Sequence, residues 1–129
     1  MIYLDSCVII YLVEAHPRWG AAVASAIGSG EVDFAVSPLV QCECLAGPIR
    51  TVSAILQRDW LFTEFTLLDM CGSVFLRAAE LRAHSRIKLP DALHLACAEY
   101  HHCDELWTND DRRTRVSRGL AKNILDARA

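Results

Sequence analysis

The hydrophobic positions of the chain fall into short apolar runs that alternate with longer segments of helical spacing. The short runs end at polar or turn-forming residues, which is typical of strands buried in a sheet. The strands predicted from them are residues 2–4, 32–36, 65–68, 106–108 and a last edge strand at 123–125.

The segments between these runs carry apolar residues at helical spacing, and prolines and glycines mark their ends. Ser37 followed by Pro38 has the signature of an N-cap and a first helical position, and Gly47 ends the helix that follows. The predicted helices are residues 8–13, 17–27, 38–46, 49–60, 71–84, 91–101 and the short 112–118.

The alternation of strands and helices defines the expected fold. No Asn-Gly or Asp-Gly hairpin signal occurs, so the strands are expected to lie parallel, and a buried parallel sheet needs helices on both faces. The sequence therefore predicts an α/β fold, a three-layer α/β/α sandwich around a short, mainly parallel sheet of about five strands. No repeat or linker interrupts it, so we expect residues 1–129 to form one domain.

Composition agrees with a globular domain. Of the 129 residues, 53% are hydrophobic and 22% are charged, and a chain of this length buries roughly two-thirds of its unfolded surface without metal or disulfide staples. The apolar runs are too short to cross a membrane, and the first residues lack the basic and apolar segments of an export signal. We therefore expect a cytoplasmic protein with no membrane partner.

The cysteines are expected to be reduced thiols in that compartment. Zinc-type ligands crowd near the predicted helix 91–101, where His94, Cys97 and His101 share one face, but no paired CxxC motif accompanies them. We therefore interpret Cys97 as a small buried hydrophobe and the histidines as part of a solvated helix end.

The net charge is −3, but the second half of the chain is locally basic. Its densest cationic segment comprises Arg112, Arg113, Arg115, Arg118 and Lys122. Such a run is usually a solvated face, and a dedicated nucleic-acid binder would be basic throughout. Charge alone therefore leaves nucleic-acid contact open.

Four acidic residues lie near the carboxyl ends of strands, where a parallel sheet places its working cleft. Asp5 and Asp110 follow predicted strands. Glu43 lies in the helix entered from the second strand, and Asp91 lies in the first turn of another helix. Each has an ordinary interpretation as a turn former, a cap or a helix acid, but their neighbours in sequence are mostly apolar rather than charged.

Convergence of these four carboxylates would favour a bound cation, because their charges repel one another. An all-oxygen cluster selects hard ions such as Mg²⁺ or Mn²⁺, and these ions suit phosphoryl chemistry, in which they stabilise the attacking and departing oxygens. Ser6 and Thr108 are then candidates for orienting the carboxylates.

The four acids lie in segments 3–6 (YLDS), 37–43 (SPLVQCE), 89–96 (LPDALHLA) and 108–110 (TND). In this order, spanning essentially the whole chain, the segments resemble the successive acidic motifs of PIN-domain ribonucleases, especially VapC-like toxins of type II toxin–antitoxin pairs. The resemblance implies a Mg²⁺- or Mn²⁺-dependent endoribonuclease that hydrolyses RNA phosphodiesters by means of a metal-activated water.

The resemblance also implies roles for individual residues. The catalytic residues are then Asp5, Glu43, Asp91 and Asp110, of which Asp5, Asp91 and Asp110 bind the metal. The supporting residues are Ser6, Thr108 and, as an optional outer ligand, Asp111.

The expected substrate is RNA that is single-stranded at the cut, because a shallow acidic rim reaches an exposed backbone more readily than a duplex. Arg112, Arg113 and Arg115 are expected to contact its flanking phosphates. The resemblance implies a small antitoxin protein as a partner and a homodimer. Wide apolar surfaces on the predicted helices 8–13 and 49–60 favour such contacts, although a thick core would also explain them.

Two features depart from the family pattern, and two other functions remain open. One departure is the doubled acid Asp110–Asp111, where the TND match favours Asp110. Cys7 stands where the family more often has a small polar residue, which leaves the support of Asp5 open. A catalytically silent PIN-like domain that binds RNA or protein would be expected to have lost acids that this chain retains. An aspartate-based phosphatase or receiver domain fits less well, because the phosphatase needs a second acid where Cys7 stands.

Overall fold

The structure of the protein is a computed structural model that describes residues 1–13, 17, 20–28, 30, 32–45 and 63–123. The predicted helix 49–60 lies outside these residues, as do the last two residues of the predicted edge strand 123–125.

The described residues contain one five-stranded sheet in which every neighbouring pair of strands runs parallel. The strand order is β3-β2-β1-β4-β5, which places β1 at the centre, where Ile2 lies beside Phe34 of β2 and Glu105 of β4. The strands are β1 Ile2–Leu4, β2 Phe34–Val36, β3 Thr66–Leu67, β4 Glu105–Thr108 and β5 Ala121–Asn123.

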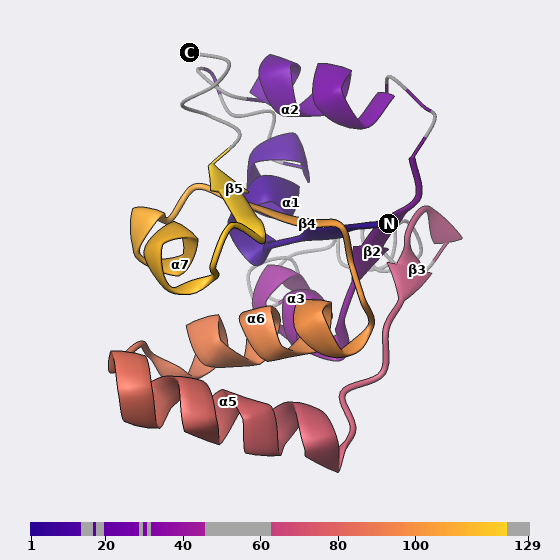
Figure 1. Ribbon diagram of the computed structural model, residues 1–129. Coiled ribbons are helices and arrows are strands. Elements are labelled where there is room, and N and C mark those ends of the chain that lie inside the picture. Colours follow the sequence, from indigo (N-terminus) through magenta and orange to yellow (C-terminus); the bar gives the residue numbers. More distant parts are fainter. Residues whose placement is uncertain (14–16, 18–19, 29, 31, 46–62, 124–129) are drawn as a thin grey trace.

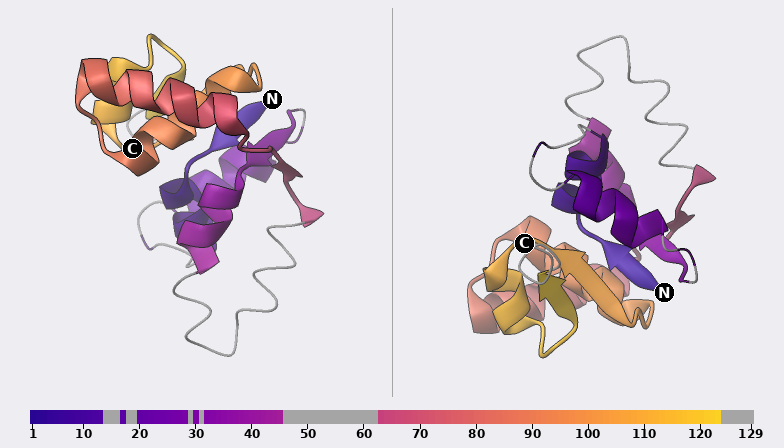
Figure 2. Two further views of the ribbon diagram at one scale, coloured as in Figure 1. Left: turned by 90° about the horizontal axis from the view of Figure 1, so that it is seen from below. Right: turned by 90° about the horizontal axis from the view of Figure 1, so that it is seen from above.

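Helices cover both sides of this sheet, which confirms the predicted three-layer α/β fold. α5 and α6 pack together on one side, and α1 and α2 pack together on the other (Figure 1). Seen from below, α5 lies in front of the sheet, and seen from above, α2 does (Figure 2). The helices of the described residues are α1 Ser6–Val13, α2 Gly20–Gly28, α3 Pro38–Leu45, α5 Gly72–Ser85, α6 Leu89–Tyr100 and α7 Asp111–Val116. None of them is long and apolar enough to span a membrane.

Two predicted boundaries need correction. α2 begins at Gly20, three residues after Pro17, so this proline does not open the helix. β5 begins at Ala121 rather than Asn123, because the backbone turns through positive φ at Arg118 and Gly119 and then pairs Ala121 with Leu106. The tight turn therefore ends α7 early and moves the edge strand toward the N-terminus.

The core lies on both faces of β1 and around α6. Tyr3 and Leu4 of β1 are completely buried, as are Leu95 of α6 and Leu106 of β4. In α6, every residue from Asp91 to Ala98 is buried, because this helix packs between the sheet and α5. Acidic and imidazole side chains in this stretch are thus held away from solvent, which makes α6 a rigid support for a site.

Candidate functional site

The site is built at the carboxyl ends of the two central strands, β1 and β4. Leu4 pairs with Trp107 in the sheet, and the next amide, Asp5 N–H, donates to the Trp107 carbonyl at 3.0 Å. This register brings Asp5 beside Thr108 although they are 103 residues apart in sequence. The parallel sheet therefore creates the contact that the sequence motifs predict.

Both oxygens of the Asp5 carboxylate accept hydrogen bonds. Ser6 N–H donates to Oδ1 at 2.6 Å, and the Thr108 hydroxyl donates to Oδ2 at 2.7 Å. The Cys7 thiol lies 3.4 Å from Oδ2, and burial raises the pKa of this thiol to about 11, so it remains a donor. Asp5 is only 1% exposed. Its orientation is thus fixed, and Cys7 takes part in fixing it.

Thr108 also connects Asp5 to the segment that carries Asp110. The Thr108 oxygen accepts the Asp110 N–H at 3.0 Å while its hydroxyl donates to Asp5. The intervening Asn109 donates from Nδ2 to the Tyr11 hydroxyl at 2.6 Å. These contacts fix the backbone at the half-buried Asp110 relative to the Asp5 carboxylate through the single oxygen of Thr108.

Glu43 reaches the same place from α3. Its Oε1 accepts the Ser6 hydroxyl at 2.6 Å and His94 Nε2 at 2.7 Å. Burial raises the pKa of Glu43, but the hydrogen bonds from His94 and Ser6 outweigh this and leave the pKa below its ordinary value. Glu43 is therefore an ionised carboxylate. Ser6 connects the two acids, because its hydroxyl donates to Glu43 and its N–H donates to Asp5.

His94 is the main residue that sequence reasoning placed wrongly. It was expected on a solvated helix end, but it is completely buried because α6 is enclosed on all sides at this position. Its Nδ1 lies 2.7 Å from the Tyr3 hydroxyl, which lies 2.7 Å from the Ser37 hydroxyl. The available signal was spacing, since His94 follows Asp91 by three residues and so shares its helix face.

The other members of the suspected zinc cluster have different partners. The His101 Nε2–H donates to the Asp69 carbonyl at 2.7 Å, whereas His94 faces Glu43. Cys97 is completely buried, and its burial raises the pKa of the thiol to about 12. Cys97 thus has the environment of a small core residue, as predicted.

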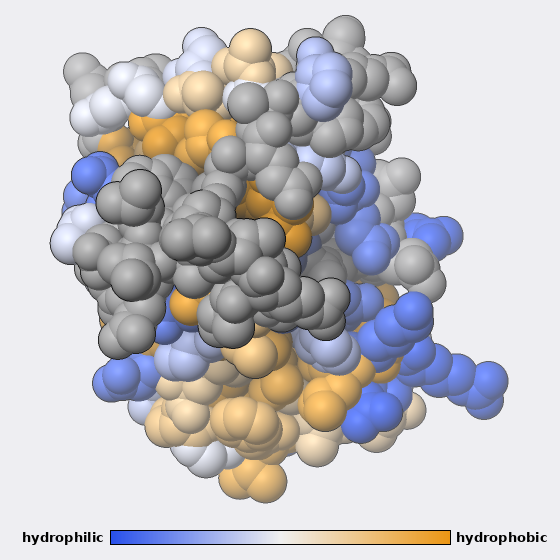
Figure 3. All heavy atoms as spheres, turned by 180° about the vertical axis from the view of Figure 1, so that it is seen from behind, coloured by the Kyte–Doolittle hydropathy of each residue, from blue (hydrophilic) through white to orange (hydrophobic). Residues whose placement is uncertain are grey.

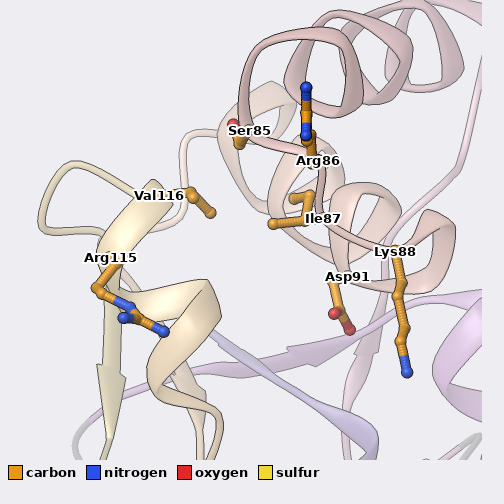
Figure 4. A pocket seen from close by; sticks show the side chains of 7 residues that line it. All are labelled: Ser85, Arg86, Ile87, Lys88, Asp91, Arg115 and Val116. Carbon is orange, nitrogen blue, oxygen red and sulfur yellow. The ribbon is translucent and has the colours of Figure 1, made fainter.

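Asp91 is 7% exposed and lines a pocket of about 320 Å³ beside α7. Arg115 reaches toward this pocket from one side, and Lys88 extends beside Asp91 on the other (Figure 4). The lining residues are Ser85, Arg86, Ile87, Lys88, Asp91, Arg115 and Val116. This pocket therefore offers a carboxylate to a metal ion and cations to an anionic group, which suits a substrate that can bind both. Sequence reasoning included Arg115 but missed Arg86 and Lys88, although both lie in a basic loop before Pro90.

Three predicted residues at the start of α7 are placed only by their backbone. Asp111, Arg112 and Arg113 belong to this helix, which follows Asp110 directly. The orientation of their side chains lies outside the described structure.

The residue types of the site fit a hard divalent cation. Among the described residues, no group of three or more His, Cys, Asp or Glu side chains is arranged to hold a metal ion. The acids at the sheet edge nevertheless offer carboxylate oxygens, the ligands that Mg²⁺ and Mn²⁺ prefer. Asp5 and Asp91 are both nearly fully buried, and buried carboxylates need compensating charge or donors. The types of donor atom therefore suit a hard divalent cation.

Solved structures with this fold have low sequence identity to the chain. A toxin-antitoxin complex from Klebsiella pneumoniae matches with a TM-score of 0.82 and 22% identity, over 96% of this chain and 98% of that one. FitAcB from Neisseria gonorrhoeae matches with a TM-score of 0.79 and 19% identity, over 96% and 98%. VapC20 from Mycobacterium tuberculosis, a sarcin-ricin loop cleaving toxin, matches with a TM-score of 0.76 and 16% identity, over 89% and 94%.

At these low sequence identities, the structural similarity shows that the fold is shared and nothing more specific. Among curated proteins, none matches the sequence. A profile of the PIN domain, however, matches residues 2–119, which include all four acidic motifs and nearly the whole sheet. The chain therefore belongs to the PIN domain family.

Proposed function

We propose that this protein is a divalent-metal-dependent endoribonuclease and the toxin of a toxin–antitoxin pair. The observation that carries the proposal is the buried Asp5, held by Thr108 and Ser6 at the carboxyl end of the central strand and linked by Ser6 to Glu43. A silent binding domain has no need for a buried carboxylate with every oxygen oriented, since such burial is costly. Membership of the PIN family supports the same function.

In this proposal Asp5, Asp91 and Asp110 would hold Mg²⁺ or Mn²⁺, with Asp111 as an outer ligand. The ion, when bound, would supply Lewis acidity toward the phosphodiester and lower the pKa of a coordinated water. Glu43, whose pKa is lowered, is proposed to accept a proton from the attacking water. Thr108 and the Ser6 amide keep Asp5 from rotating during the reaction.

The cations beside Asp91 are proposed to hold the RNA backbone. Arg115 lines the pocket together with Lys88 and is exposed, so a phosphate next to the cut can reach it. Arg112 and Arg113 belong to the same helix and are proposed to extend this contact. Contacts to phosphates do not select a base sequence. Single-stranded RNA is the proposed substrate because a shallow acidic rim reaches an exposed backbone more readily than one held in a duplex.

The toxin role is inferred from the relatives. Structures of similar fold include toxin-antitoxin complexes, and VapC20 is described as a toxin that cleaves the sarcin-ricin loop. We propose that this chain acts in the cytoplasm, forms a homodimer and is inhibited by a small antitoxin protein. An arginine or lysine of the antitoxin would pair with the acidic site and block it without changing the fold.

The test is RNA cleavage by the purified protein. Wild type with Mn²⁺ or Mg²⁺ is expected to cut single-stranded RNA, and EDTA or Asp5→Asn is expected to abolish cutting. Asp69→Asn, which changes an exposed acid outside the site, should retain full activity. RNA binding without cleavage would instead identify a silent domain, and a phosphoryl group trapped on Asp5 would identify a phosphatase or receiver.

A further inference from the structure

A continuous line of buried hydrogen bonds runs from the start of α3 to Glu43. The Ser37 oxygen lies 2.7 Å from the Tyr3 hydroxyl, and this hydroxyl lies 2.7 Å from His94 Nδ1. On the other side of the imidazole, Nε2 lies 2.7 Å from Glu43 Oε1. Ser37, Tyr3 and His94 are all completely buried, so water does not supply alternative partners.

The direction of the last link follows from the charge of Glu43. This residue is ionised, and a carboxylate can only accept hydrogen bonds. The proton at this link must therefore be on His94 Nε2. Asp5 Oδ1 lies 3.7 Å from the same nitrogen, which is too far for a hydrogen bond. Glu43 is therefore the acceptor of the hydrogen bond from Nε2–H.

The remaining links take their direction from this proton. With the ring proton on Nε2, Nδ1 can act as the acceptor of the Tyr3 hydroxyl, which lies 2.7 Å away. The Tyr3 oxygen can then accept the Ser37 hydroxyl, which lies 2.7 Å away. The Ser37 oxygen in turn accepts the Val40 N–H at 3.3 Å, which ties the line to the backbone of α3.

We infer that Ser37, Tyr3 and His94 are positioning residues that hold the Glu43 carboxylate for RNA hydrolysis, an inference that rests on the proposed function. Two donors from different helices, Ser6 of α1 and His94 of α6, meet at the single oxygen Oε1. Among the described residues, no hydrogen bond is formed by Oε2, which is left for a substrate or water proton. The side chain of Glu43 is 33% exposed, so without this clamp it would adopt several rotamers.

Placement of a reacting group to within a fraction of an ångström depends on such supporting residues. Loss of a supporting hydrogen bond of this kind commonly costs 10–100-fold in activity. Because Glu43 is expected to act on the reaction and not on RNA affinity, the loss should fall on kcat and leave KM nearly unchanged. A residue that only stabilised the fold would lower the folded fraction instead, so kcat is compared per folded protein, as measured by circular dichroism.

The first test is spectroscopic and needs no activity. Nitrogen-15 NMR of His94 in the metal-free wild-type protein should show that Nε2 of the imidazole carries a proton. A proton on Nδ1 alone would overturn the inference, because the link to the Glu43 carboxylate would then lack its donor.

The second test removes one hydroxyl. Tyr3→Phe should lower kcat about 10–100-fold with KM within about twofold of wild type. The matched control is Tyr100→Phe, which removes the hydroxyl of a 48% exposed residue at the far end of α6 and should leave kcat unchanged. A folded Tyr3→Phe protein with wild-type kcat would contradict the inference.

A third variant pair keeps the inference testable if Tyr3→Phe does not fold. His94→Gln retains an N–H donor at the reach of Nε2 and should be at least about tenfold more active than His94→Leu, which retains none. Equal activity of the two variants would overturn the inference while RNA cleavage by wild type still supported the proposed function. Absence of cleavage by wild type would contradict the proposed function itself.

Discussion

Thr108 shows how one short side chain organises a site. Its hydroxyl donates to Asp5 while its oxygen accepts the amide of Asp110, so one oxygen atom fixes two of the four acids relative to each other. The residue is completely buried, and no water can replace it at either contact. Its contribution is therefore to geometry, and its loss should affect activity more than the fold.

Thr108→Val is expected to lower kcat/KM for RNA about 10–100-fold, because valine keeps the shape but removes the donor to Asp5. Thr108→Ser keeps the hydroxyl and should retain most of the activity. Steady-state cleavage measured at saturating metal, with circular dichroism to check folding, tests this expectation. Equal rates for the valine and serine variants would exclude this role for the hydroxyl.

The cysteines should differ sharply in reactivity toward iodoacetamide. Burial raises the pKa of Cys44 and Cys97 to about 12, so both remain protonated, unreactive thiols at pH 8. Cys42 is exposed, and a hydrogen bond with Tyr100 lowers the pKa of Cys71. Mass spectrometry of the folded protein should therefore find label on Cys42 and Cys71 first. Early labelling of Cys44 or Cys97 would show that the core is more open than described.

At the scale of the helices, α5 and α6 differ in how far their apolar side chains are buried. α6 is buried at every position from Asp91 to Ala98, whereas α5 exposes Phe75 and Leu76. Seen from behind, hydrophobic residues gather over the lower part of the molecule (Figure 3). Stability should therefore depend strongly on apolar residues of α6 and weakly on those of the outer face of α5.

Leu95→Ala and Leu76→Ala form a matched pair for this expectation. Leu95 is completely buried, so its truncation should lower the free energy of unfolding by about 2–5 kcal/mol. Leu76 is 71% exposed, so the same change should cost less than about 0.5 kcal/mol. Urea unfolding monitored by circular dichroism gives both values, and similar losses for the two variants would be inconsistent with the described packing.

The elements and the acids of the site were predictable, because their signals are local. Strand residues 2–4 and the helix start at Ser37–Pro38 follow from apolar runs and capping residues, and Asp5 and Asp110 follow from strand ends. The role of His94 was not predictable in this way. Its burial depends on α5 and on contacts to Tyr3 and Glu43 from distant segments, which the helical pattern of α6 does not encode.

For the whole molecule, the proposed metal should stabilise the fold. A ligand that binds only the native state at about 100 times its Kd adds about 2.7 kcal/mol, which corresponds to several degrees in Tm for a domain of this size. Differential scanning fluorimetry with Mg²⁺ or Mn²⁺ should show this rise in wild type and in Asp69→Asn, but a smaller one in Asp91→Asn. The same rise in all three proteins would place the ion elsewhere.

The central claim is that the acids at the carboxyl edge of the sheet hydrolyse RNA, and the most direct measurement is sequencing of RNA 5′ ends in cells that express the protein. Hydrolysis by a water directed at the phosphorus expels the 3′ oxygen and does not use the ribose 2′-hydroxyl. Wild type should therefore produce discrete new ends that carry a 5′-phosphate, and these should be absent with Asp5→Asn. No new ends with wild type, the same ends with Asp5→Asn, or fragments that terminate in 2′,3′-cyclic phosphate would contradict the claim.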